Sequence, residues 1–395
     1  MLEHLDSQAP DALLALIKLH DADAREDKID LGVGVYRTNT GATPVFASIK
    51  AAERKLVENQ DSKAYLGPEG DMGFVEALMP WIFGADATMG GRLQGMQTPG
   101  GTGAVRLALA LAAKAGARRV HLGLPSWPNH QQIVADLGLE SVGFAHAAPD
   151  GSADIEAVLA VIATATAEDV VLLHGCCHNP TGVEYSADEW AQIASALSQS
   201  AALPLIDLAY HGLGKGMEED AAGMRGVLAA VPEALVAYSC DKNFGLYRDR
   251  VGALYFLARE AEALDTIASN ANALARAAWS MPPDHGAAAV RLVLNDEGLT
   301  ELWQGELADM RARMRRVRER LAAADNTVPG LNFAAVGQGS GLFAMLPLDK
   351  QQIEALRSDH AIYMAGSGRI NVAGLTEGNT PKFIAALAAV TGTHG

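Results

Sequence analysis

Cysteine is scarce in this chain, and a long hydrophobic run is lacking. The 395 residues include three cysteines, two of them the adjacent Cys176 and Cys177, so no disulfide framework or paired-cysteine metal motif is recognisable and buried free thiols are expected. The most apolar helical stretch, 104–115, contains two basic residues and is too short to span a bilayer. The first residues have neither the basic region nor the apolar core of a secretory signal, so we expect a cytoplasmic protein.

Positive charge is also in short supply. The formal net charge is -16, which argues against nucleic acid or an anionic membrane as a partner. With 49% hydrophobic and 20% charged residues, the composition is that of a compact folded enzyme and not of a disordered chain. Such a protein can still bind an acidic substrate where arginines gather locally.

The order of apolar and helical segments predicts an α/β fold. The length exceeds what a single core usually serves, so we expect a large domain at 45–300 and a small domain, with an N-terminal arm, formed by 1–44 and 301–395. Continuous apolar strands that alternate with helices indicate a mostly parallel sheet covered on both faces. The expected strands are 119–124, 170–174, 203–208, 234–239 and 251–257, and the clearest helices are 103–115, 155–164 and 187–200.

The residue pattern changes from about residue 299. Apolar residues recur there at three- and four-residue spacing, with many arginines between them. Interspersed acidic residues and the overall acidity favour an amphipathic helix with a solvated basic face over a nucleic-acid site. The stretch 341–373 is expected to form a small α+β unit.

Lys242 is the most informative residue. It comes just after an apolar segment and Ser239, and Arg248 and Arg250 follow it. A lysine amine can form the Schiff base that anchors pyridoxal phosphate (PLP), while a hydroxyl and a guanidinium can hold the phosphate. A solvated surface lysine is the ordinary alternative, so the interpretation depends on residues elsewhere.

Two turns supply such residues. The glycine-rich segment 98–103 precedes a helix, which suits a bound phosphate or a simple helix cap, and it does not match the dinucleotide-binding fingerprint. The strand at 170–174 leads to Asn179, whose amide can bond a ring oxygen. The two histidines and two cysteines at 174–178 do not have the spacing of a zinc site.

Asp207 interrupts an otherwise apolar strand. A buried carboxylate needs a cationic or hydrogen-bonding partner, which can be a protonated pyridine nitrogen, a histidine or a helix dipole. His130 and His174 are candidates to support Asp207 from behind. Arg276 and Arg369 can each bind a carboxylate through two parallel hydrogen bonds, so together they suit a dicarboxylic amino acid, although each alone is more often an ordinary ion-pair residue.

With these residues in place, the chain resembles the aspartate and aromatic aminotransferase family, the class I branch of the fold-type I PLP enzymes. The similarity extends over about 31–373. Its motifs occur in the family's order: 31–36 (LGVGVY), 65–67 (YLG), 100–103 (GGTG), 126–130 (SWPNH), 178–182 (HNPTG), 242–245 (KNFG) and 367–369 (SGR).

The resemblance implies a role for each matching residue. Lys242 would be the Schiff-base lysine, Asp207 would keep the pyridine nitrogen protonated, and Asn179 and Tyr210 would bond the ring hydroxyl. Trp127 would stack on the ring and line the substrate site. The phosphate would be held by Gly101, Thr102, Ser239 and Arg250 of one chain, together with Tyr65 of the partner subunit. Arg369 would bind the substrate α-carboxylate with Gly34 and Asn179, and Arg276 of the partner subunit would meet a side-chain carboxylate. A site shared between chains implies a homodimer.

The chain also departs from the family pattern. Asp241 stands where serine is usual, and a carboxylate that points inward is expected to raise the pKa of Lys242. His211 stands where glutamine is common. Ala64 and Met281 occupy positions where aspartate-preferring members carry asparagine, which makes the substrate side more apolar.

We therefore expect a ping-pong transfer of an amino group from aspartate and aromatic amino acids to a 2-oxo acid, with 2-oxoglutarate as the preferred acceptor. The open alternatives are an aspartate-only enzyme, one that uses glyoxylate, and a lyase of the same fold, which would gain nothing from Arg276. A PLP-binding regulator would need an added DNA-binding segment, and a nicotinamide dehydrogenase would need the missing fingerprint.

Overall fold

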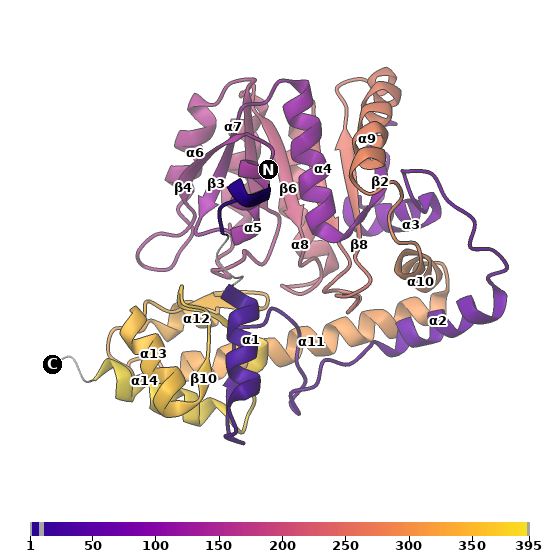
Figure 1. Ribbon diagram of the computed structural model, residues 1–395. Helices are drawn as coiled ribbons and strands as arrows, with labels where there is room; N and C mark the ends of the chain where they lie inside the picture. Colours follow the sequence, from indigo (N-terminus) through magenta and orange to yellow (C-terminus); the bar gives the residue numbers. More distant parts are fainter. Residues whose placement is uncertain (1, 8–11, 393–395) are drawn as a thin grey trace. The chain divides into compact units, whose positions relative to one another are not determined.

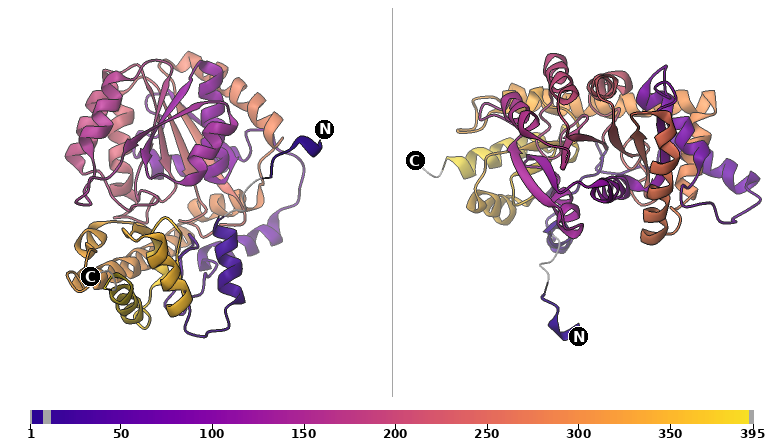
Figure 2. Two further views of the ribbon diagram at one scale, coloured as in Figure 1. Left: turned by 60° about the vertical axis from the view of Figure 1, so that its left-hand side comes forward. Right: turned by 90° about the horizontal axis from the view of Figure 1, so that it is seen from above.

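The computed structural model describes residues 2–7 and 12–392. The chain divides into two compact units, which are traced in Figures 1 and 2. The larger unit comprises 44–313 and 339–341, and the smaller unit comprises 1–43, 314–338 and 342–395. Among the described residues, no helix is both long and apolar enough to cross a membrane.

A seven-stranded sheet forms the centre of the larger unit, with the strand order β2-β8-β7-β6-β5-β3-β4. Strands β3 to β7 pair in parallel, whereas β8 pairs antiparallel with both β7 and β2. The mostly parallel sheet predicted from the sequence is therefore confirmed. The strands are β2 (Leu93–Pro99), β3 (Arg119–Leu124), β4 (Glu140–Ala145), β5 (Asp169–His174), β6 (Leu203–Leu208), β7 (Ala234–Ser239) and β8 (Val251–Leu257).

Helices cover both faces of this sheet (Figure 2). One face packs its apolar side chains against α4 (Gly100–Ala115), α5 (Pro128–Asp136) and α9 (Leu264–Ala278). On the other face, the Tyr255 hydroxyl donates a 2.8 Å hydrogen bond to the Val75 carbonyl of α3 (Met72–Phe83). The remaining helices of the unit are α2 (Ala47–Asn59), α6 (Ile155–Thr164), α7 (Ala187–Ser198), α8 (Met217–Ala230), η2 (Ala261–Ala263), α10 (His285–Leu294) and the first part of α11 (Glu297–Ala323).

The sequence located the interior strands better than the outer ones. β3, β6, β7 and β8 occupy their predicted ranges, and β8 is the antiparallel strand among these four. The reason is its connection, because residues 240–250 join β7 to β8 without the helix that a parallel crossover requires. The outer strands β2 and β4 were missed because their sequences mix polar and apolar residues, as suits the two edges of a sheet.

The amphipathic helix expected from about residue 299 is α11, and its predicted apolar positions are buried. The prediction that its arginines are solvated is wrong in two places, because Arg313 is 5% exposed and Arg318 is 2% exposed. The Arg318 guanidinium donates 2.6 Å hydrogen bonds to the carbonyls of Val336 and Phe343. Backbone acceptors thus compensate for the burial of this charge.

The smaller unit is an α+β structure, as predicted for 341–373. Two short strand pairs form it: β1 (Ile29–Asp30) parallel to β10 (Ile362–Tyr363), and β9 (Phe343–Met345) antiparallel to β11 (Arg369–Asn371). Their apolar side chains share one core with the end of α11 and with α14. The helices are η1 (Leu2–His4), α1 (Ala12–Ala22), α12 (Phe333–Gln338), α13 (Lys350–His360), η3 (Val372–Gly374) and α14 (Thr380–Thr391).

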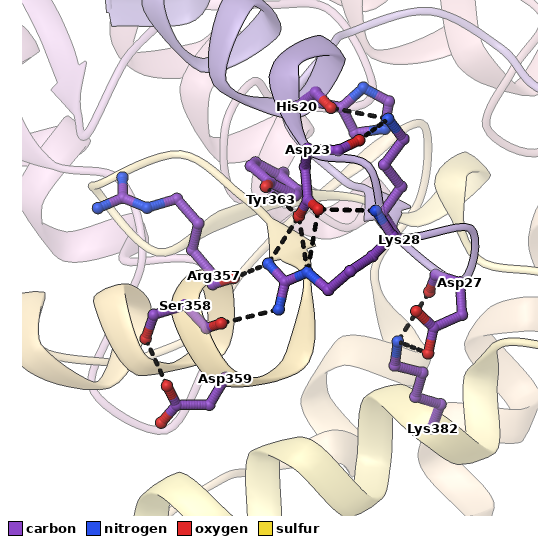
Figure 3. Close-up of polar contacts among 10 residues, drawn as sticks. His20, Asp23, Asp27, Lys28, Arg357, Ser358, Asp359, Tyr363 and Lys382 are labelled. Carbon is purple, nitrogen blue, oxygen red and sulfur yellow. Dashed lines mark hydrogen bonds and ion pairs between the residues drawn. The ribbon is translucent and has the colours of Figure 1, made fainter.

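A polar network secures the chain after α1 in this unit (Figure 3). The Arg25 guanidinium forms three hydrogen bonds to the Asp23 carboxylate, at 3.0, 2.9 and 2.6 Å, and also donates to the carbonyls of Arg357 and Ser358 at the end of α13. The Tyr363 hydroxyl donates a further 2.6 Å bond to Asp23. Residues far apart in the sequence are joined in this way.

Candidate active site

The polar residues singled out in the sequence follow strands that end at one edge of the sheet. Trp127 follows β3, Asn179 follows β5, Asp207 lies near the end of β6, and Lys242 follows β7. Gly101 is the second residue of α4, which begins directly after β2, and β2 runs in the same direction as β7 because both pair antiparallel with β8. Ligands of α/β proteins bind at this carboxyl edge, so the topology gathers these residues where a ligand is expected.

Asp207 is buried and belongs to a chain of hydrogen bonds with His130 and Ser126. His130 Nε2 lies 2.9 Å from Asp207 Oδ2, and His130 Nδ1 lies 2.9 Å from the Ser126 hydroxyl. Burial by itself would raise the pKa of Asp207, but the hydrogen bond and charge of His130, with His174 and Lys242 nearby, hold that pKa below its usual value. Because an ionised carboxylate only accepts, His130 Nε2 donates to Asp207.

His174 lies behind this pair. Its ring centroid is 5.2 Å from that of His130, and burial, with the neighbouring His130 charge, lowers the pKa of His174 to about 3. Its Nε2 has no hydrogen-bond partner within the described part of the chain. A neutral ring and a nearby anion create an environment that favours a cationic ligand beside Asp207.

Lys242 contacts the ring of Tyr210, with its Nζ 5.0 Å from the ring centroid. Burial lowers the pKa of Lys242, and it outweighs the opposing effects of Asp241 and Asp207. The charge of Asp241 raises the pKa of Lys242, as predicted, but desolvation of the ammonium has the larger effect. A lysine with a lowered pKa is more readily neutral and therefore more nucleophilic.

Asn179 and Tyr210 lie together beside the lysine. Asn179 Nδ2 donates to the Tyr210 hydroxyl at 3.3 Å. The buried Asn179 Oδ1 has no hydrogen-bond partner among residues 2–7 and 12–392. Buried polar atoms are rarely left unsatisfied, so this oxygen indicates a missing ligand donor.

The start of α4 forms an anion-binding cup. Pro99 precedes the helix and provides no side-chain cap, so the first N–H groups of α4 point toward the cup. Gly100 has a φ of +69°, and a Cβ there would meet Arg250 Nη2 at 2.6 Å; a Cβ on Gly101 would meet the Cβ of Ser239 at 2.9 Å. Helix N–H groups, a hydroxyl and a guanidinium thus converge, which fits a phosphate.

The Trp127 indole lies against the histidine that supports Asp207. Trp127 is the residue before α5, and its ring meets the His130 ring edge-on, with centroids 5.0 Å apart. The groups at this edge therefore fit PLP: they are a lysine amine, a carboxylate that can face a ring nitrogen, an unsatisfied amide oxygen and a cup for a phosphate.

Gly34 and Arg369 belong to the smaller unit, where both contact Phe343. The Arg369 guanidinium lies 4.5 Å from the Phe343 ring centroid and donates to the Gly32 carbonyl, and a Cβ on Gly34 would meet Phe343 Cζ at 2.8 Å. Sequence reasoning missed Asn371, whose Nδ2 donates to the carbonyls of Val33 and Val35 at 2.6 and 2.7 Å. These two bonds fix the loop around Gly34, and the only signal was the position of Asn371 two residues after Arg369.

Two predicted site residues of the larger unit do not join the cluster within their own chain. Tyr65 is 94% exposed, and Arg276 is exposed with its Nη1 2.6 Å from the Ser280 hydroxyl. Both were assigned to a partner subunit, and that assignment stays a prediction.

His211 is held by hydrogen bonds to other residues of the chain. Its Nε2 donates to the Met217 carbonyl at 2.6 Å, so its Nδ1 accepts from the Tyr238 hydroxyl at 3.1 Å. The Tyr238 hydroxyl in turn accepts from Asn243 Nδ2 at 2.8 Å, directly beside Lys242. Burial lowers the pKa of His211 to about 4, which keeps this neutral tautomer at neutral pH.

The two cysteines of the segment 174–178 do not cluster with the two histidines of the same segment. Cys176 and Cys177 are buried thiols, as expected, and lie with Asp220 in a group whose ligand atoms are within 4.8 Å of one another. Asp220 already accepts hydrogen bonds from the backbone N–H groups of Gly212, Gly214 and Lys215. His178 instead stacks on His146, with centroids 3.4 Å apart.

Comparison with known proteins identifies the class and then the family. The mostly parallel sheet flanked by helices is the fold of the fold-type I PLP enzymes: an aromatic-amino-acid aminotransferase from Burkholderia pseudomallei, described as covalently bound to pyridoxal phosphate, matches 99% of this chain and 99% of its own with a TM-score of 0.93 and 32% identity. The chain belongs to the family "Aminotransferase class I and II", which matches residues 26–387. It is a PLP-dependent transaminase by that membership.

Curated relatives cover nearly the whole chain. A tyrosine aminotransferase from Rhizobium meliloti is 48% identical over 95% of this chain and 96% of its own length. An aspartate aminotransferase from Escherichia coli is 40% identical over 99% of this chain and 100% of its own length.

Proposed function

We propose that this protein moves an amino group from aspartate and aromatic amino acids to a 2-oxo acid, preferably 2-oxoglutarate, through PLP held at Lys242. The observation that carries the proposal is the juxtaposition of a partly buried lysine of lowered pKa, an ionised Asp207 and the unsatisfied Asn179 Oδ1. When bound, the cofactor supplies an electron sink for the Cα electrons of the substrate.

The chain's own residues have distinct tasks in this proposal. The Lys242 amine, more readily neutral because burial lowers its pKa, is the base that moves the proton at the substrate Cα. Asp207 would face the ring nitrogen, held in place by His130 and Ser126. Both half-reactions would use the same amine, so ping-pong kinetics are expected.

The remaining roles concern anions. Gly101, Thr102, Ser239 and Arg250 would hold the phosphate at the start of α4. Arg369 and Gly34 would hold the substrate α-carboxylate. The exposure of Tyr65 and Arg276 supports a homodimer in which each of them serves the site of the other chain. We place this homodimer in the cytoplasm and its cofactor-binding domain at 45–300.

Aspartate and aromatic substrates are proposed together because two positions make the substrate side apolar. Ala64 offers no hydrogen bond to a carboxylate, and Met281 offers a thioether that accepts from the Leu66 N–H at 3.1 Å. The curated relatives are named for tyrosine, aromatic and aspartate transamination, which supports both substrate classes. An aspartate-only enzyme and an enzyme using glyoxylate are the alternatives, and a lyase of the same fold is a more remote one.

The test is kcat/KM for aspartate, tyrosine and phenylalanine, each against 2-oxoglutarate, oxaloacetate and glyoxylate. Comparable values for aspartate and the aromatic amino acids are expected. Turnover of aspartate alone would overturn the dual specificity, and a strong preference for glyoxylate would point to a different acceptor. Absence of turnover with every pair would favour the lyase.

Arg276→Leu tests the side-chain carboxylate assignment. Removing the guanidinium should lower kcat/KM for aspartate by roughly 100-fold, because a carboxylate loses its ion-pair partner, and should spare phenylalanine. Arg259→Leu is a matched control, since Arg259 is an exposed arginine paired with Glu233. Equal losses for both substrates would show that Arg276 does not bind the substrate side chain.

A further inference from the structure

Asp241 places a negative charge inside the proposed phosphate cup. It is 4% exposed, and its Oδ2 accepts a 2.5 Å hydrogen bond from Arg250 Nη1. The same pair lies against the start of α4, because a Cβ on Gly100 would meet Arg250 Nη2 at 2.6 Å and Asp241 Oδ2 at 3.2 Å. A carboxylate and the guanidinium meant for a phosphate thus share one small space.

The carboxylate is only partly satisfied. Asp241 Oδ1 is buried and has no hydrogen-bond partner in the described part of the chain. The Asp241 N–H donates to the Ser239 hydroxyl at 3.2 Å, so the backbone of Asp241 also contacts a second proposed phosphate ligand. The carboxylate is therefore built into the cup.

We propose that Asp241 competes with the phosphate group of the cofactor for Arg250, and so sets a weaker cofactor affinity than an uncharged residue at this position would give. This inference rests on the proposed function, because the phosphate is that of PLP. A serine, usual at this position in the family that the sequence resembles, would leave Arg250 Nη1 without a carboxylate partner. With Asp241, the incoming phosphate takes over a guanidinium that is already paired and meets a like charge beside it.

Affinities of ligands that separate the phosphate from the rest of the cofactor test the proposal. Isothermal titration calorimetry of the full-length protein, freed of cofactor by dialysis, should use three probes: PLP, pyridoxine 5'-phosphate, which lacks the aldehyde, and pyridoxine, which also lacks the phosphate. Asp241→Asn keeps the size of the side chain and removes its charge, and Asp241→Ser removes both. Asp249→Asn removes the same charge from the same loop and is the matched control.

The expected result is specific to the phosphate. Asp241→Asn and Asp241→Ser should each bind pyridoxine 5'-phosphate about 10-fold more tightly or better, as loss of a close like charge predicts. Pyridoxine affinity should stay unchanged in both, and Asp249→Asn should behave like the wild type with all three probes.

Two results would overturn the inference. Unchanged pyridoxine 5'-phosphate binding in both Asp241 variants would show that the carboxyl group does not compete with the phosphate. Weaker binding in both would show that the carboxyl group instead supports phosphate binding. An equal gain for pyridoxine would show an effect unrelated to the phosphate. Failure of PLP to bind the wild type and every variant is a different outcome, because it would overturn the proposed function and this inference with it.

Discussion

The polar network around Asp207 in the larger unit and the one around Asp23 in the smaller unit each centre on a carboxylate, but their hydrogen-bonding groups are satisfied to different extents. The Asp23 carboxylate accepts from the Arg25 guanidinium and the Tyr363 hydroxyl, and Lys28 donates to its backbone carbonyl (Figure 3). Asp207 accepts from His130, while Asn179 Oδ1 and His174 Nε2 beside it have no partner among the described residues.

The difference separates a structural network from a ligand site. In the Asp23 network each donor stabilises the ionised carboxylate, and hydrogen bonds from Arg25 and Tyr363 lower its pKa. In the Asp207 network burial opposes ionisation, yet the pKa is still lowered, mainly by the hydrogen bond and charge of His130. Buried polar atoms without partners cost stability unless a ligand satisfies them, so we expect substitutions in the two networks to have opposite consequences.

Lys242→Ala should have the largest effect. Loss of the amine removes both the cofactor anchor and the base, so transamination should fall by about 10,000-fold or more, measured as kcat with aspartate and 2-oxoglutarate. Lys215→Ala removes an exposed lysine of the same unit and should leave turnover unchanged. Substantial residual turnover in Lys242→Ala would contradict the assignment of this residue.

Asp207→Asn should come next. The amide cannot keep a ring nitrogen protonated, so the rate of each half-reaction in single-turnover experiments should fall by roughly 100-fold or more. The midpoint of thermal unfolding of the cofactor-free protein should change by no more than a few degrees, because relief of the desolvation opposes the loss of the interaction with the His130 ring. A large loss of stability with normal half-reactions would mean that this network is structural, like the one around Asp23.

Tyr363→Phe should have the smallest effect, and it should act on stability alone. Loss of the hydroxyl removes a donor to Asp23, so the unfolding midpoint at neutral pH should fall by a few degrees while kcat/KM is retained. The lowered pKa of Asp23 makes its contribution complete above 3.8, its ordinary pKa, and lost as the pH falls toward the folded-state value. The difference between variant and wild type should therefore shrink in acid; a pH-independent difference would exclude this origin.

Much of the site followed from sequence because it lies where apolar strands end. The runs before Asp207 and Lys242 have the continuous hydrophobicity of buried parallel strands, and both became β6 and β7 at the predicted bounds. Asn371 could not be predicted, because its bonds to the carbonyls of Val33 and Val35 join residues more than 300 positions apart. The burial of Arg318 was hidden for the same reason, since its acceptors come from outside its helix.

The sequence by itself determined the fold class and the family and supplied the candidate residues for the chemistry, because these depend on local apolar patterns and on side-chain types at strand ends. The tertiary structure alone decided the electrostatics. Burial lowers the pKa of Lys242 despite the opposing charge of Asp241, and the meeting of Asp241 with Arg250 at the start of α4 placed a carboxylate in the phosphate cup. Desolvation and charge pairing depend on distances between segments, which no single stretch of sequence contains.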